Sequence, residues 1–352
     1  MQVKGIDHVE FYVANADEVA AQLCAAYGFR VQGQVGGIDH HSILIRQNDI
    51  RLLLTEGRTE THPATVYVQR HGDGPATIAL STDDPDGALT EAVAAGAVPL
   101  SAIPLDEVSA TSRVRITAFG DVAHTFVHPG ELDERLVPVE PTANAEPLAL
   151  LDILDHVALC VPAGELIPTV QFYEGVLGFK QIFEEYIEVG VQAMNSRVVQ
   201  SPSAGVTLTI LEPDTSRMPG QIDDFLRAHD GAGVQHLALR TDDIATSVRT
   251  LSERGVGFLS TPVSYYDELL VRLGHVGLPV DTLRELNVLV DQDNEGELFQ
   301  IFAQSVHSRR TFFFEVIERR DALTFGSANI KALYQAVERE RARTSPGAAV
   351  SG

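Results

Sequence analysis

Short runs in which apolar and polar residues alternate recur along the whole chain. Examples lie at residues 42–46 (SILIR), 50–55 (IRLLLT), 197–200 (RVVQ) and 206–211 (VTLTIL). Successive side chains of a strand point to opposite faces, so a period of two predicts β-strands with one face on a core. Helical patterns lie between some of these runs. The pattern therefore predicts an α+β protein.

The order of these elements repeats. Residues 5–13 (GIDHVEFYV) match residues 153–161 (ILDHVALCV), and each run leads into a helical pattern that ends at a Gly-Phe pair. Residues 77–84 (TIALSTDD) match residues 236–243 (HLALRTDD), and each is followed by a helix that closes on a glycine. A repeat of this kind indicates a duplicated fold. We expect four βαβββ units in two pairs.

A stretch without a sustained period separates the two halves. Residues 129–147 are rich in proline and glutamate, which is typical of a linker. We therefore expect a first domain at 1–130, a linker at 131–150 and a second domain at 151–340. Residues 341–352 offer no apolar face and are expected to form a flexible tail.

Composition narrows the class of protein. The 352 residues are 44% hydrophobic and 21% charged, as expected for two globular domains. Twenty-six Lys and Arg against 49 Asp and Glu give a net charge of −23, which disfavours nucleic acid and anionic membranes as partners. There are two cysteines, no secretory pattern and no run of 18 apolar residues, so we expect a cytoplasmic protein.

The two halves differ at positions where a metal could bind. Residue 236 is a histidine, but its counterpart in the first half is Thr77. The second half thus has His156 and His236 at the start of matching strands, whereas the first half keeps only His8. Two imidazoles that converge on one point suit a first-row divalent metal. A third ligand is then required.

Glu315 is the best candidate for that ligand. It lies in the aromatic run 310–319 (RTFFFEVIER), where a buried carboxylate is costly without a compensating cation. Alternation places it on one strand face with Phe313 and Ile317. Two histidines and one carboxylate form the facial triad of non-haem Fe(II) oxygenases, although Zn, Mn or Co could fill the same donor set.

Other readings of these residues stay open. A histidine beside an aspartate, as in Asp155-His156, is often structural. The rival metal candidates are His40, His41, His124 and His128. Neighbours on a strand point to opposite faces, and no carboxylate strand like 310–319 accompanies these rivals.

Several segments resemble one known family. Residues 313–319 (FFEVIER) and 325–334 (FGSANIKALY) resemble the C-terminal signature of 4-hydroxyphenylpyruvate dioxygenases and their close relatives, the 4-hydroxymandelate synthases. Residues 233–239 (GVQHLAL), 298–302 (LFQIF) and the strand with Asp155-His156 belong to the same pattern, which covers residues 5–340. The resemblance implies the vicinal oxygen chelate fold, with two open-barrel domains. It also makes His156, His236 and Glu315 the ligands of Fe(II), and 4-hydroxyphenylpyruvate and O2 the substrates.

The strand at 205–213 (GVTLTILEP) bears on the product. The dioxygenases typically have Pro-x-Asn-Glu-Pro where this chain has Thr209, Leu211 and then Glu-Pro. A threonine followed two residues later by an aliphatic residue resembles the mandelate synthases, as does Ile330 where the dioxygenases usually have phenylalanine. We therefore expect 4-hydroxymandelate and CO2. A homogentisate-forming dioxygenase is the alternative, and a non-catalytic metal- or small-molecule-binding protein is the third hypothesis.

Matching position also implies a set of substrate contacts: Ser196, Thr209, Leu211, Gln221, Gln300, Phe302, Phe313, Phe325, Asn329 and Ile330. Gln235 belongs to the pattern, but alternation points it away from His236, so it is left out. Core packing is the alternative role for each phenylalanine. The helix at 327–340 is expected to close the cavity, with Gly326 as a hinge. No separate acid or base is assigned, a homodimer is a candidate assembly, and a synthase would imply a role in antibiotic biosynthesis.

Overall fold

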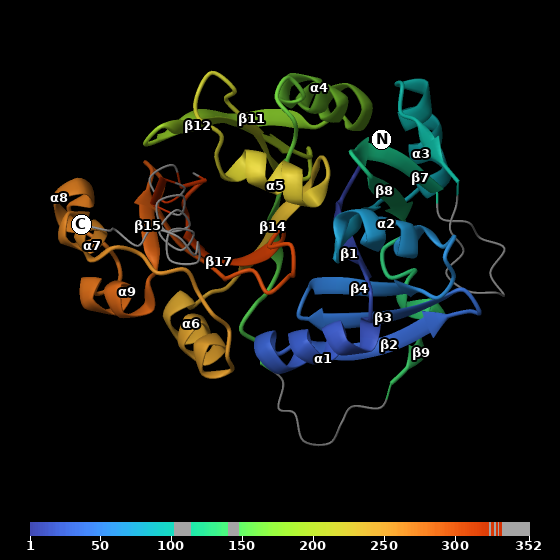
Figure 1. Ribbon diagram of the computed structural model, residues 1–352, viewed down its shortest axis with the longest axis horizontal. Helices are drawn as coiled ribbons and strands as arrows, with labels where there is room; N and C mark the ends of the chain where they lie inside the picture. The colour runs from blue at the N-terminus through green and yellow to red at the C-terminus, as the bar shows by residue number, and fades with distance from the viewer. Residues whose placement is uncertain (102–113, 140–147, 324, 327–328, 330, 333–352) are drawn as a thin grey trace, which may run out of the picture.

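The protein forms two curved sheets that lie side by side (Figure 1). Its structure is a computed structural model that describes residues 1–101, 114–139, 148–323, 325–326, 329 and 331–332. The first half, blue to teal, makes a nine-stranded sheet, and the second half, green to red, makes an eight-stranded sheet. This arrangement confirms the predicted α+β class.

The first half contains two βαβββ units in sequence. The first unit comprises β1 (Gly5–Val13), α1 (Ala16–Tyr27), β2 (Arg30–Gly36), β3 (His40–Gln47) and β4 (Ile50–Gly57). After α2 (Pro63–His71), the second unit comprises β5 (Gly74–Ser81), α3 (Pro85–Ala94), β6 (Pro99–Leu100), β7 (Val114–Phe119) and β8 (Val122–Val127). A 3₁₀ helix, η1 (Asp133–Arg135), and β9 (Val137–Pro138) follow.

The second half repeats this plan. Its first unit comprises β10 (Leu154–Cys160), α4 (Leu166–Leu177), β11 (Lys180–Val189), β12 (Gln192–Gln200) and β13 (Thr207–Pro213). After α5 (Gln221–His229) come β14 (Gly233–Arg240), α6 (Ile244–Glu253), β15 (Leu289–Gln292), β16 (Glu297–Phe302) and β17 (Phe313–Arg320). Three short helices, α7 (Val263–Asp267), α8 (Leu269–Leu273) and α9 (Val280–Leu286), are inserted between α6 and β15. The four predicted units are confirmed.

The strand order shows how the units pair. The second sheet runs β11-β12-β13-β10-β14-β17-β16-β15, and the first runs β2-β3-β4-β1-β5-β8-β7-β6 in the same sense, with β9 added beside β2. In each half the two units join through an antiparallel pair, β1 with β5 and β10 with β14. These joining strands therefore lie in the middle of each sheet, and they carry the histidines that the repeat singled out.

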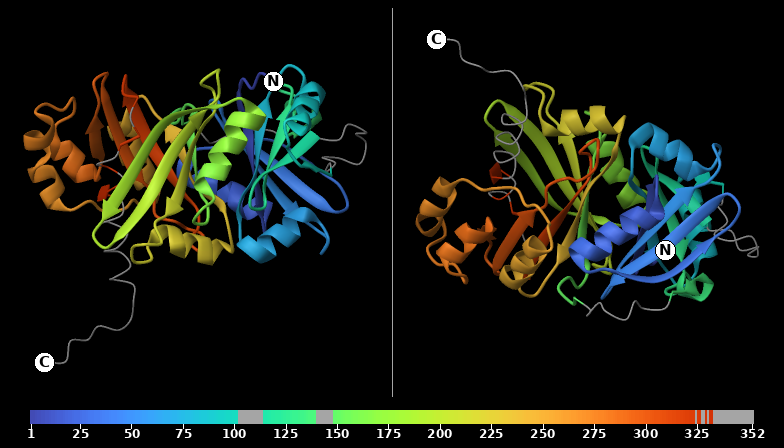
Figure 2. Two further views of the ribbon diagram at one scale, coloured as in Figure 1. Left: turned by 90° about the horizontal axis from the view of Figure 1, so that it is seen from above. Right: turned by 60° about the horizontal axis from the view of Figure 1, so that its bottom comes forward.

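Aromatic side chains join the two halves into one core. The rings of Phe11 and Phe312 lie edge to face at 5.1 Å, and those of Tyr27 and Phe314 lie at 5.0 Å. Buried residues from both sheets belong to the same hydrophobic cluster. Figure 2 shows the two curved sheets next to each other, and the hydrophobic clusters place α4 and α5 on opposite faces of the second sheet. The first half is thus part of the packing that supports the second.

The predicted linker is partly structured. Residues 137–138 pair with β2, where Pro138 lies opposite Gly33, and Asp133 binds Arg51 at 2.6 Å. Residues 140–147 and the predicted tail lie outside the described residues. No helix in the described part of the chain is long and apolar enough to cross a bilayer.

His124 on β8 contributes to the contact between the halves and predicts a pH dependence. It is fully buried, its Nδ1 donates to the carbonyl of Ile78 at 3.1 Å, and its Nε2 lies 2.9 Å from the hydroxyl of Tyr173 on α4. Burial lowers the pKa of His124 to about 4. A depressed pKa means that its contribution to stability is complete above the unfolded value near 6.5 and is lost as the pH falls through 4.

We therefore expect the free energy of unfolding to fall by roughly 3 kcal/mol between pH 7 and pH 4 through this group alone, since one pKa unit is about 1.4 kcal/mol. Urea unfolding of the wild type and of His124→Gln across this range measures the effect. The glutamine variant should be less stable at pH 7 but should show a shallower pH dependence. Equal slopes for the two proteins would contradict this account.

Candidate metal centre

Three adjacent strands in the middle of the second sheet carry His156, His236 and Glu315. The strands are β10, β14 and β17, and their register places Ala158 opposite His236 and Ala238 opposite both His156 and Glu315. Residues that lie opposite each other on paired strands share a face of the sheet. The three candidate ligands therefore leave the same face, although 79 or more residues separate each from the next in sequence.

The geometry of these side chains suits a divalent cation. Nε2 of His236 lies 3.3 Å, and Nε2 of His156 lies 3.5 Å, from Oε2 of Glu315. The three ligand atoms all lie within 4.8 Å of one another, and Glu315 is only 1% exposed. A carboxylate buried to this depth requires a positive partner. Burial lowers the pKa of His236, which favours the neutral ring that metals bind. The residues present therefore fit the predicted metal.

A second set of residues orients the two histidines. Nδ1 of His156 donates to Asp155 at 2.9 Å, and Nδ1 of His236 donates to the side-chain oxygen of Gln235 at 3.2 Å. With the proton on Nδ1, each ring turns an Nε2 lone pair toward Glu315, which is the arrangement that supports metal ligation. Arg319 binds Asp155 through two nitrogens, at 2.8 and 2.9 Å.

The charge on Asp155 is well supported. Burial alone would raise the pKa of Asp155, but hydrogen bonds from His156 and Arg319, together with their charges, outweigh it and hold the pKa below its usual range. Asp155 thus stays an acceptor for His156. Sequence reasoning assigned no role to Asp155, Gln235 or Arg319. Asp155 and Gln235 directly precede the two histidines, which was the available signal for them, whereas Arg319 lies four residues after Glu315.

The equivalent positions of the first half lack this donor set. On β1, β5 and β8 the register places His8 and Thr125 opposite Ala79, and Thr77 opposite Glu10. His8, Thr77 and Thr125 therefore occupy the places of His156, His236 and Glu315. The inferred replacement of a histidine by Thr77 is confirmed, and the third ligand is also replaced.

Most of the predicted substrate contacts lie around the candidate centre. The ring of Phe313 stacks on His236 at 5.0 Å, Phe302 lies opposite Glu315 on the neighbouring strand, and the ring of Phe325 is 5.8 Å from His156. Nε2 of Gln300 donates to Oε1 of Glu315 at 2.8 Å.

The remaining predicted contacts lie on the next elements. Leu211 on β13 lies opposite Cys160 and Ser196, and Thr209 lies opposite Ala158 on β10, so all of them share the face that carries the ligands. Gln221 begins α5 and lines a cavity with Phe313. Asn329 is fully buried. Ile330 and most of the predicted closing helix lie outside the described residues.

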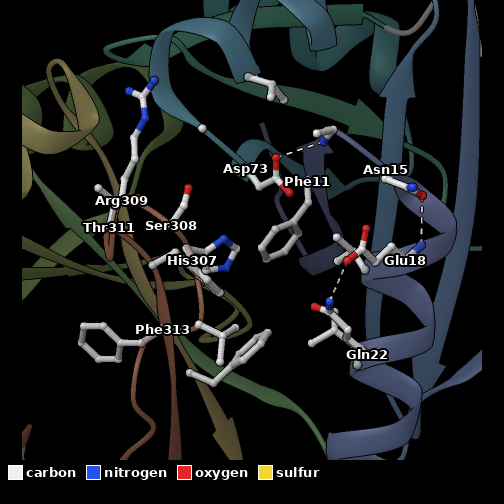
Figure 3. A pocket seen from close by; sticks show the side chains of 18 of the residues that line it. Phe11, Asn15, Glu18, Gln22, Asp73, His307, Ser308, Arg309, Thr311 and Phe313 are labelled. Carbon is white, nitrogen blue, oxygen red and sulfur yellow. Dashed lines mark hydrogen bonds between the residues drawn. The ribbon is translucent and has the colours of Figure 1, made fainter.

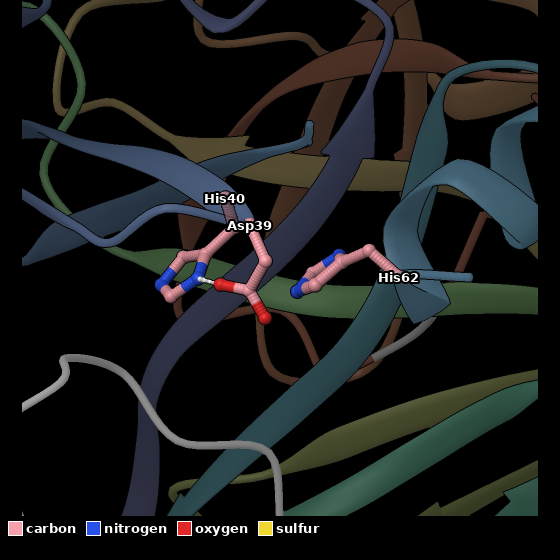
Figure 4. Close-up of side chains that lie close together, drawn as sticks. All are labelled: Asp39, His40 and His62. Carbon is pink, nitrogen blue, oxygen red and sulfur yellow. Dashed lines mark hydrogen bonds and ion pairs between the residues drawn. The ribbon is translucent and has the colours of Figure 1, made fainter. Parts of the chain in front are cut away.

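Another group of potential ligands lies in the first half (Figure 4). His40, one of the rival candidates, lies near Asp39 and His62, with ligand atoms within 4.8 Å. Nδ1 of His62 accepts the backbone N–H of Ala64 at 3.2 Å, so the neutral ring carries its proton on Nε2, which points toward Asp39. Nδ1 of His40 donates to the same carboxylate at 2.8 Å. Nε2 of His62, in contrast, is buried without a hydrogen-bond partner among the described residues.

A cavity of about 490 Å³ lies between the two halves (Figure 3). Asn15 and Glu18 of α1 line one side, and His307 and Phe313 line the other. None of the three candidate ligands lines it. The cavity is therefore distinct from the metal centre, although the ring of Phe313 borders both.

Comparisons with known proteins agree with this geometry. Residues 153–300 match the Glyoxalase/Bleomycin resistance protein/Dioxygenase superfamily. A 4-hydroxyphenylpyruvate dioxygenase from Dictyostelium discoideum is 33% identical over 361 residues, which cover 96% of this chain and 98% of that protein. A similar enzyme from Aspergillus fumigatus is 32% identical over 96% of this chain and 93% of its own length.

Solved structures extend the comparison to the fold. A mutant of 4-hydroxymandelate synthase from Streptomyces coelicolor is 40% identical, with a TM-score of 0.85, and the match covers 97% of this chain and all of that one. A xylose isomerase-like TIM barrel/4-hydroxyphenylpyruvate dioxygenase fusion protein is 25% identical, with a TM-score of 0.78, over 96% of this chain and 53% of that one. The chain therefore belongs to the family of 4-hydroxyphenylpyruvate dioxygenases and 4-hydroxymandelate synthases, in the vicinal oxygen chelate superfamily.

Proposed function

We propose that this member of the family is an Fe(II)-dependent 4-hydroxymandelate synthase. It would convert 4-hydroxyphenylpyruvate and O2 into 4-hydroxymandelate and CO2. One oxygen atom of O2 enters the new carboxylate and the other enters the benzylic hydroxyl, so the atoms balance without a further reductant. His156, His236 and Glu315 would hold the iron.

The protein's task is to bind and orient the substrate. Bound Fe(II) would supply the chelation of the 2-oxo acid and the activation of O2. Three protein ligands would leave the metal open to further ligands, and the rings of Phe302 and Phe313 lie next to His236. These rings would hold the aromatic ring of the substrate by stacking. They would also keep water away from the reacting carbon atoms.

A buried hydroxyl is a candidate hydrogen-bond partner for the phenol end of the substrate. The hydroxyl of Thr209 is buried, lies on the ligand face of the sheet, and has no hydrogen-bond partner among the described residues. A buried hydroxyl without a partner costs free energy. We propose that the phenol of 4-hydroxyphenylpyruvate provides the partner.

The single observation that carries the product assignment is the inner face of β13. Leu211 lies two residues beyond Thr209 and packs in an apolar cluster with Cys160 and Phe302. Its side chain can accept and donate no hydrogen bond, so the substrate ring is held there by contact alone. The ring can then turn until its benzylic carbon faces the iron site. The full-length similarity to a 4-hydroxymandelate synthase supports the same choice.

The second candidate is the homogentisate-forming dioxygenase. Curated relatives that match nearly the whole chain are named 4-hydroxyphenylpyruvate dioxygenase. Both activities share substrate, metal site and fold, so the side chains that orient the ring are what distinguishes them.

The product itself gives the first test. We expect the Fe(II)-loaded protein, incubated with 4-hydroxyphenylpyruvate and O2, to form 4-hydroxymandelate as its main aromatic product. The two candidate products are isomers, so chromatography against both standards is required, and O2 uptake alone is not enough. Homogentisate as the main product would establish the alternative, and no O2 uptake would favour a non-catalytic binding protein.

Replacing Glu315 with alanine tests the ligand set. Loss of a charged ligand from a three-residue site should lower iron affinity by at least ~100-fold, beyond the 10–100-fold typical of outer-shell partners. Iron content after desalting and turnover should therefore fall together. Thr125→Ala, at the equivalent place in the first half, should leave both unchanged. Glu315→Ala protein that keeps its iron would remove the assignment.

Replacing Leu211 with asparagine tests the orientation of the ring. A new hydrogen bond of about 1 kcal/mol to the substrate would raise the ratio of homogentisate to mandelate by roughly fivefold. Leu211→Met keeps the volume and the apolar character, so this control should preserve the wild-type ratio. The measurement is the ratio of homogentisate to mandelate that each variant forms at equal iron occupancy. An asparagine variant with the wild-type ratio would exclude this role for position 211.

A further inference from the structure

We propose that Tyr265 on α7 is a positioning residue that fixes the orientation of the Glu315 carboxylate through Asn329 and Gln300. This inference rests on the proposed function in one respect, since it takes Glu315 to be a metal ligand. Tyr265 itself touches neither Glu315 nor the two histidines in any described contact. Its influence is transmitted by side-chain amides.

The connection is a continuous chain of hydrogen bonds. The hydroxyl of Tyr265 lies 3.0 Å from Oδ1 of Asn329, Nδ2 of Asn329 lies 2.8 Å from Oε1 of Gln300, and Nε2 of Gln300 lies 2.8 Å from Oε1 of Glu315. Asn329, Gln300 and Glu315 are each at most 2% exposed. We call these four residues the amide relay. Its members come from α7, the C-terminal segment, β16 and β17.

The chemistry of the carboxylate sets the direction of every bond. An ionised Glu315 can only accept, so Gln300 must turn its NH₂ toward it and its carbonyl toward Asn329. Asn329 must then donate through its own NH₂, which leaves its carbonyl oxygen facing Tyr265. That oxygen can be satisfied only by a donor, and the Tyr265 O–H is the donor in reach. Both amide orientations therefore follow from one charge.

The other contacts of Tyr265 leave its hydroxyl proton available to donate to Asn329. Its hydroxyl oxygen accepts the N–H of Val290 at 2.7 Å and a guanidinium N–H of Arg272 at 3.1 Å, which occupies both lone pairs. The carbonyl of Val290 is a second acceptor within reach of this proton, at 2.9 Å, but Arg272 also donates to it at 3.0 Å, whereas Oδ1 of Asn329 has no other donor among the described contacts. The relay thus runs in one direction from the cation of Arg272 to the anion of Glu315. Hydrogen bonds aligned in this way polarise and strengthen one another.

Close packing holds the middle of the relay. Gly326 has a φ of +74°, and a Cβ added there would lie 2.2 Å from Oε1 of Gln300. Only glycine allows this backbone to approach the amide so closely. The Gln300 side chain is therefore confined by the C-terminal segment as well as by its two hydrogen bonds.

The relay determines which oxygen of Glu315 is available to a metal. Oε1 is occupied by Gln300, whereas Oε2 faces both imidazole nitrogens at 3.3 and 3.5 Å. Without the Tyr265 hydroxyl, the Asn329 carbonyl would be buried with no donor among the described residues, which weakens the hold of Asn329 on Gln300. A Gln300 side chain that is held less firmly would let the Glu315 carboxylate turn. Gln300 still has a second N–H for a substrate contact.

Tyr265→Phe tests the relay. We expect the dissociation constant for Co(II), used as a spectroscopic probe of the apoprotein, to rise three- to tenfold, and the visible absorption of the bound Co(II) to change shape. Turnover number should also fall, because the Glu315 carboxylate is held less firmly. Tyr266→Phe removes the hydroxyl of the adjacent buried tyrosine, which is outside the relay, and should match the wild type in all three measurements.

The outcomes separate this inference from the proposed function. Tyr265→Phe that matches Tyr266→Phe in Co(II) affinity and spectrum would overturn the relay, whatever product the enzyme forms. Glu315→Ala that still binds Co(II) tightly would instead overturn the ligand assignment. If Tyr265→Phe fails to fold, Arg272→Gln replaces it, because Arg272 is exposed and its loss lets the Tyr265 proton turn to Val290. The same spectral change at smaller amplitude is expected there, and an unchanged spectrum would refute the relay.

Discussion

The second half of this protein is organised around the burial of one carboxylate. Glu315 stands in a strand of aromatic and aliphatic residues and is 1% exposed, a position that is unfavourable for a charged group unless several partners compensate it. Two imidazole nitrogens and one amide N–H converge on its two oxygens. None of these groups carries a fixed positive charge. The arrangement therefore fits a divalent metal site. The surrounding side chains and the register of the sheet hold these groups in place.

Duplication shows which parts of the site belong to the scaffold and which belong to the chemistry. The first half keeps the pair Asp7-His8, with Nδ1 of His8 2.7 Å from Asp7, and an arginine, Arg51, that binds the aspartate at 2.9 Å. The second half has the same pair in Asp155 and His156, but its arginine, Arg319, comes from β17 and not from the strand equivalent to β4. An aspartate that orients a histidine is thus a feature of the repeated fold. The halves differ at two positions, where the first half has Thr77 and Thr125 and the second has His236 and Glu315.

The parts that were predictable from the sequence depend on short-range patterns and on the repeat. Alternation located the strands, and comparison of the halves isolated His236, because these signals lie within a few residues or between equivalent positions. The relay was not predictable in this way, since Tyr265 lies in an irregular insertion and reaches Asn329 only through folding. The same holds for His62, which approaches Asp39 from another element, and for Val137–Pro138, which form a strand too short to show a period. Such contacts depend on tertiary packing that no local pattern encodes.

Local charge explains how an acidic protein could take an anionic substrate. The net charge of −23 acts at long range, but it is screened beyond about 8 Å at physiological ionic strength. Within that distance Asp155 is neutralised by Arg319, whereas Glu315 has no cationic side chain against it among the described residues. A divalent ion on Glu315 would leave the centre with one positive charge, and the carboxylate of a 2-oxo acid cancels it. A buried arginine against Glu315 would compete with a metal ion for the carboxylate. A neutral amide such as that of Gln300 stabilises the carboxylate and leaves its charge available to the metal, so the loaded centre can still attract an anion.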